Sequence, residues 1–192
     1  DRVINAEQDQ PNHYRFRAEV YRVWGKLGHA VRDYQKMVQL APDSPVAYNG
    51  LAEVCLQRGE YPQALEAARK ANQLAPADWV TFYNLGMIED RLALSEAVVE
   101  HLQKALALKV KDSRHRVLIH FYLARAYSRL NRMDAAQEQV QAVKRLSAGL
   151  EEWQVILDDK QADTLRAVIG SDVADAQALL RGELEPVDLV GE

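Results

Sequence analysis

The feature that most constrains this chain is a sequence pattern that repeats every 34 residues. Tyr14, Tyr48 and Phe82 stand 34 residues apart. Further positions match at the same spacing: Ala18, Ala52 and Gly86; Gly25, Gly59 and Ala93; Ala30, Ala64 and Val98; Leu40, Leu74 and Leu108. A fixed period of this length is typical of proteins built from stacked helical hairpins, in which each hairpin buries its apolar face against its neighbours.

A fourth copy of the pattern follows if four residues are inserted near residues 113–116. Asn131 then matches Ala93, and Ala136 and Val143 fill the core positions of the copy. Four residues make about one turn of an α-helix. We therefore expect the first helix of the fourth unit to be about one turn longer than its counterparts.

The pattern resembles the tetratricopeptide repeat, in which aromatic, Leu-Ala or Leu-Gly, Gly, Ala and Pro residues recur in this order. The second unit carries it most fully, in Tyr48, Leu51, Ala52, Gly59, Tyr61, Ala64, Ala71 and Pro76. The sequence departs from the family pattern at Arg17, Glu89 and Val110. The resemblance implies an all-α fold: a right-handed α-solenoid of about four helix-turn-helix repeats, followed by C-terminal capping helices.

We expect the chain to divide at the repeat boundaries. The expected segments are an N-terminal tail at 1–10, repeats at 11–44, 45–78, 79–112 and 113–146, and C-terminal capping helices with an acidic tail at 147–192. Residues 149–192 hold 11 acidic and 3 basic side chains, a net charge of −8. Trp153 lies on an apolar helical face that suits a cap over the last hairpin, and Ser171 with Asp172 resembles the start of a final helix.

In tetratricopeptide proteins the first helix of each repeat lines a concave groove, which binds an extended peptide or a partner helix. The resemblance therefore predicts a protein or peptide partner and a set of partner-binding residues. That set is Phe16, Asn49, Glu53, Leu56, Tyr83, Asn84, Met87, Arg91, Phe121, Tyr122, Arg125 and Arg129. Amide side chains suit a peptide backbone, and arginines suit a carboxylate.

Four alternatives are weighed at this stage. The acidic C-terminal segment could fill the groove itself, or the groove face could be ordinary solvated surface. The chain could self-associate as a homo-oligomer through an end of the solenoid or through its C-terminal helices. Helical repeats of similar length also bind RNA, but the pI of about 5.8 and the absence of a basic stripe argue against nucleic acid.

The sequence gives no sign of an enzyme. It lacks a glycine-rich phosphate loop, an HExxH motif and a nucleophile elbow. His115 and His120 lie five residues apart, which places them on different helix faces, and the single cysteine, Cys55, excludes an internal disulfide. We predict no catalytic residues, no cofactor, no metal site, no small-molecule substrate and a cytoplasmic location. A membrane tether outside residues 1–192 stays open, because the sequence does not begin with Met.

Overall fold

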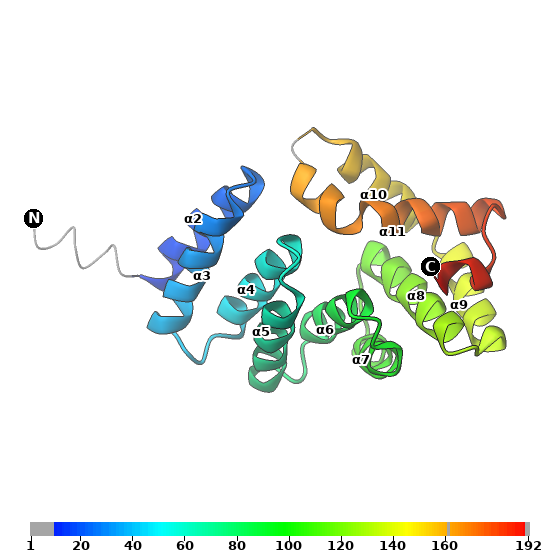
Figure 1. Cartoon of the computed structure of the whole chain (residues 1–192), viewed down its shortest axis with the longest axis horizontal. Coiled ribbons are helices and arrows are strands. Elements are labelled where there is room, and N and C mark those ends of the chain that lie inside the picture. The colour runs from blue at the N-terminus through cyan, green and yellow to red at the C-terminus, as the bar shows by residue number, and fades with distance from the viewer. Residues whose placement is uncertain (1–9, 161, 191–192) are drawn as a thin grey trace, which may run out of the picture. The chain divides into compact units, whose positions relative to one another are not determined.

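The computed structural model describes residues 10–160 and 162–190, and these residues form α-helices and one 3-10 helix without any strand. The helices are α2 (Pro11–Val23), α3 (Leu27–Leu40), α4 (Pro45–Gln57), α5 (Tyr61–Leu74), α6 (Trp79–Arg91), α7 (Ser95–Ala107), α8 (Ser113–Arg129), α9 (Met133–Arg145), α10 (Ala148–Asp158), α11 (Asp163–Arg181) and the 3-10 helix η1 (Pro186–Val190). The all-α prediction is therefore confirmed (Figure 1).

The turn inside each helix pair uses the same backbone conformation at the same repeat position. Gly25, Gly59, Ala93 and Asn131 have φ values of 69°, 74°, 54° and 57°. This left-handed conformation ends the first helix of a pair, and it suits glycine because a Cβ atom is strained there. The four residues give a structural register that aligns all four repeats.

The first helices of repeats 2, 3 and 4 also begin with equivalent caps. The Ser44 hydroxyl accepts a hydrogen bond from the backbone N–H of Ala47, at 3.4 Å. Asp78 and Asp112, at the same position of the next repeats, accept from backbone N–H groups at 3.0 and 2.9 Å. Each cap satisfies a donor that has no partner within the helix.

The described residues up to Pro76 form one compact unit, unit 1, which holds α2 to α5. Its helices pack closely because small residues occupy their crossings. Ala18, Ala52 and Ala64 are fully buried. The ring of Tyr34 lies directly on Gly50, where an added Cβ atom would stand 2.0 Å from Tyr34 Cε1. The small residues of the repeat pattern are thus packing residues.

Residues from Ala77 onward form a second unit, unit 2, which holds α6 to α11 and η1. Its first two pairs are α6 with α7 and α8 with α9. Helix α8 has 17 residues, whereas α2, α4 and α6 have 13 each, which confirms the expected extra turn. Helix α10 packs on α8, and η1 packs on α8 and α9.

The last long helix differs from the prediction. Helix α11 does not begin at Ser171 but runs from Asp163 through Gly170 to Arg181, and Gly182 ends it with a φ of 73°. A glycine inside a helix costs about 1 kcal/mol relative to alanine. Asp172 makes no cap here, because its carboxylate is held by side chains of other helices. These tertiary contacts outweigh the local preference for a helix start.

Candidate functional site

Most of the predicted partner-binding residues lie on α6 and α8 of unit 2. We call this surface the α6–α8 face and define it by Tyr83, Met87, Arg91, Tyr122 and Arg125. All of these side chains except Arg91 are buried, and so are Asn84 and Phe121. Arg91 and Arg129 are half-buried. The face is therefore covered within the chain.

Helix α11 covers this face. It packs against α8, and Arg91 of α6 donates a hydrogen bond to the Val168 backbone oxygen of α11 at 2.6 Å. Figure 1 shows α10 and α11 as a pair lying next to α8. The structure thus answers the question that the sequence left open: part of the acidic C-terminal segment occupies the face of repeats 3 and 4.

A carboxylate of α11 lies at the centre of the contact. Asp172 is 1% exposed. It accepts a hydrogen bond from the Tyr122 hydroxyl at 2.8 Å, and Arg125 Nη2 lies 3.0 Å from its Oδ1. Arg91 forms the third contact, with both guanidinium Nη atoms directed at the two carboxylate oxygens. Three donors from α6 and α8 therefore converge on one acidic side chain.

A second carboxylate, Asp90, holds the arginines in place from within the face. Arg125 makes a two-pronged contact with it, in which Nε lies 3.0 Å from Oδ1. Arg129 Nη1 lies 2.9 Å from the same oxygen, and Arg91 Nη1 lies 3.1 Å from Oδ2. Arginines with paired donors match carboxylates in this geometry. Asp90 thus orients the arginines that bind Asp172.

The pKa values of the group follow from burial and charge. Burial alone would raise the pKa of Asp172, but the hydrogen bond from Arg91 and the positive charges of Arg125 and Arg91 lower it below its usual range. Burial and the neighbouring Asp172 carboxylate raise the pKa of Tyr122 well above its usual value. The carboxylate is therefore ionised at neutral pH and the tyrosine keeps its proton, as the hydrogen bond between them requires.

Apolar contacts surround the ionic centre. Ile169, Val173, Ala176 and Leu179 of α11 are buried. With Asp172 they form one continuous stripe along the helix at spacings of three and four residues. Helix α10 adds Trp153, whose ring lies 5.6 Å from the His115 ring of α8. What the α6–α8 face binds is thus an amphipathic helix with one aspartate in its apolar stripe.

The remaining predicted residues lie in unit 1. Phe16 of α2 is 61% exposed, whereas Leu56 of α4 is buried. Asn49 and Glu53 are half-buried.

Sequence reasoning missed Asp90 and Asp172 as parts of the site. Asp90 pairs with Arg125 and Arg129, which lie 35 and 39 residues further along the chain. No local spacing reveals such a contact. The one available signal was charge, since the acidic C-terminal segment complements three arginines predicted on one face.

The described residues contain no group of three or more His, Cys, Asp or Glu side chains arranged to hold a metal ion. His120 is half-buried: its Nδ1 lies 2.8 Å from Gln139 Oε1, and burial lowers its pKa. Nor is any helix in the described ranges long and apolar enough to cross a bilayer.

Comparison with known proteins agrees with the repeat geometry. Residues 25–84 match the model of the tetratricopeptide repeat family. This stretch of the chain thus carries tetratricopeptide repeats. Among curated proteins no match was found.

Solved structures of tetratricopeptide proteins resemble the chain over most of its length. YrrB, described as a protein with an unusual peptide-binding site, is 20% identical with a TM-score of 0.65, over 95% of this chain and 96% of YrrB. A MamA fragment from Desulfovibrio magneticus RS-1 is 25% identical with a TM-score of 0.65, over 74% of this chain and 78% of the fragment. Another MamA structure is 18% identical with a TM-score of 0.66, over 89% of this chain and 96% of that one. These likenesses show that the fold is an α-solenoid of tetratricopeptide repeats.

Proposed function

We propose that the protein is a non-catalytic interaction scaffold, and that the α6–α8 face binds a partner helix with a carboxylate in its apolar stripe. The observation that carries this proposal is the contact of Asp172 with Arg91, Tyr122 and Arg125. The face already holds a helix of this kind in α11. The peptide-binding site named for YrrB supports a binding role for a similar fold.

In this proposal α11 and the partner compete for one surface. A partner helix of matching chemistry makes the same contacts with the arginines. The partner's apparent affinity is then its intrinsic affinity multiplied by the fraction of molecules in which α11 leaves the face uncovered. Selectivity comes from the carboxylate. A helix without it would leave Arg91 and Arg125 facing an apolar surface with one fewer acceptor.

The experiment is a fluorescence anisotropy titration with a labelled peptide of residues 163–181. The full chain with Asp172→Asn, in which α11 is loosened, should bind this peptide, and the unchanged chain should bind it at least tenfold more weakly. Asp175→Asn is the matched control: it makes the same charge change on the same helix and should behave like the unchanged chain. Equal binding by all three chains would contradict the proposal.

A second candidate function is self-association through α2. Phe16, Val20 and Val23 form an exposed apolar stripe on this helix, and Trp24, which follows the helix, is 65% exposed. In the repeat register Val20 corresponds to Val54, which is fully buried in unit 1. Light scattering with Val20→Asp tests this role: the unchanged chain should form dimers that the variant does not, and equal masses would argue against it.

A further inference from the structure

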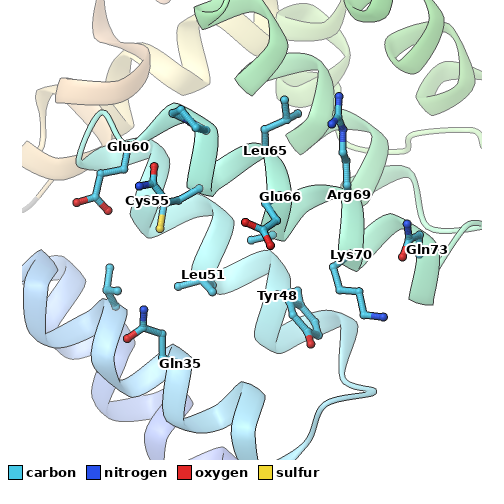
Figure 2. A pocket seen from close by; sticks show the side chains of 14 residues that line it. Gln35, Tyr48, Leu51, Cys55, Glu60, Leu65, Glu66, Arg69, Lys70 and Gln73 are labelled. Carbon is cyan, nitrogen blue, oxygen red and sulfur yellow. The ribbon is translucent and has the colours of Figure 1, made fainter.

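Unit 1 has a hollow that is lined by its own residues alone. It has a volume of about 920 Å³ and is bounded by α3, α4 and α5. Its floor is made by Leu51 and Cys55 of α4, and Val31 and Gln35 of α3 form one wall. Figure 2 shows the Gln35 amide and the Cys55 sulfur on the same side of the hollow. The size is in the range of ligand pockets, about 300–1,000 Å³.

The repeat register identifies the counterpart of this hollow in unit 2. Cys55 lies four residues before Gly59, and Tyr127 lies four residues before Asn131. Gln35 lies ten residues after Gly25, just as Gln103 lies ten residues after Ala93. By the same register, Val31 corresponds to Val99 and Leu51 to Leu123. The hollow of unit 1 and the equivalent position in unit 2 therefore share a valine, a leucine and a glutamine.

Of the four positions compared, only that of Cys55 and Tyr127 differs. In unit 2 the Tyr127 side chain fills the place and is 8% exposed. Its hydroxyl accepts a hydrogen bond from Gln103 Nε2 at 2.8 Å. In unit 1 the small Cys55 leaves the equivalent space open, and Gln35 is exposed without a hydrogen-bond partner among the described residues. Unit 1 thus has the counterparts of Val99, Gln103 and Leu123, but it has a cysteine where unit 2 has Tyr127.

We infer that this hollow binds a tyrosine side chain of a partner polypeptide, with Gln35 donating a hydrogen bond to the phenol oxygen and Leu51 and Cys55 contacting the ring. The inference is independent of the proposed function, because it concerns another unit and another ligand chemistry. Burial raises the pKa of the Cys55 thiol to about 11. The thiol therefore stays neutral and acts as an apolar surface. The rim carries both signs of charge, with Glu66 beside Arg69 and Lys70, and such a polar rim suits a peptide backbone around a buried anchor.

The test is a titration of the isotope-labelled full chain by NMR with blocked five-residue peptides that place tyrosine, phenylalanine or leucine between glycines. The tyrosine peptide should cause saturable shifts in α3 to α5 and in the Gln35 side-chain amide, with a dissociation constant on the order of millimolar. The phenylalanine peptide should bind about fivefold more weakly, since one hydrogen bond is lost. Shifts that are absent, or equal for all three peptides, would overturn the inference.

Three variants test whether the tyrosine peptide binds in this hollow. Cys55→Tyr should fill the hollow and abolish binding of the tyrosine peptide. Gln35→Leu, at an exposed position, should make tyrosine and phenylalanine peptides bind equally. Gln73→Leu, at another exposed position of the same hollow, should keep the preference. An unchanged preference in Gln35→Leu would refute the role of the glutamine even if Cys55→Tyr failed to fold.

Discussion

Neutralising Asp172 should release α11 from the α6–α8 face. Breaking a buried ion pair by removing one partner costs about 3–5 kcal/mol. Here Asp90 remains bonded to Arg91 and Arg125 after the change, so the arginines keep one carboxylate. We therefore expect Asp172→Asn to weaken the docking of α11 by about 2–3 kcal/mol, at or just below the lower limit of that range.

Hydrogen exchange of backbone amides measures this loss directly. A docking free energy lower by about 2–3 kcal/mol corresponds to exchange about 30- to 150-fold faster across α11. The amides of α4 and α5 in unit 1 should be unaffected. The matched control, Asp175→Asn, should leave α11 exchange nearly unchanged. Asp175 forms no ion pair with Arg91 or Arg125, and burial raises its pKa even though the charge of Arg125 partly offsets this. Exchange in Asp172→Asn that rises less than threefold would refute the reasoning.

Three further predictions concern packing, backbone strain and pH. Gly50→Ala should lower stability by about 1–3 kcal/mol in a thermal melt, because its methyl group would overlap the Tyr34 ring; an unchanged melting temperature would contradict this. Ala93→Gly should raise stability by about 0.5–1 kcal/mol in urea unfolding, because a φ of 54° strains any residue with a Cβ atom; a loss would count against the strain. Since the pKa of His120 is lowered in the fold, stability should fall as pH drops below the ordinary imidazole pKa of about 6.5. His120→Phe should show a smaller decrease between pH 7.5 and 5, and an equal one would exclude His120 as the cause.

The repeat period was enough to predict the helical architecture. Small residues such as Ala52 and Ala64 mark helix crossings, and Gly59 marks a turn with positive φ, because each requirement is local to one hairpin and recurs in the next. The four-residue insert likewise predicted the longer α8. These features depend on spacing along the sequence, which can be read directly.

The site could be predicted only in part. The arginines at 91, 125 and 129 were predicted to bind a carboxylate, and the structure shows them bound to Asp90 and Asp172. Which carboxylate they meet depends on how α11 folds back, and that contact joins residues about 80 positions apart. Ser171 and Asp172 even suggested a helix start, because local propensity carries no information about a distant ion pair.

The most direct test of the binding role is affinity capture from a native lysate on the immobilised Asp172→Asn chain, followed by elution with free peptide of residues 163–181. We predict that this peptide releases a specific protein and that the same peptide with Asp172→Asn does not. The unchanged chain should retain less of the released protein than the Asp172→Asn chain. If no retained protein is released by the peptide, or if both peptides release the same proteins, then the α6–α8 face is not the surface on which this protein binds its partner.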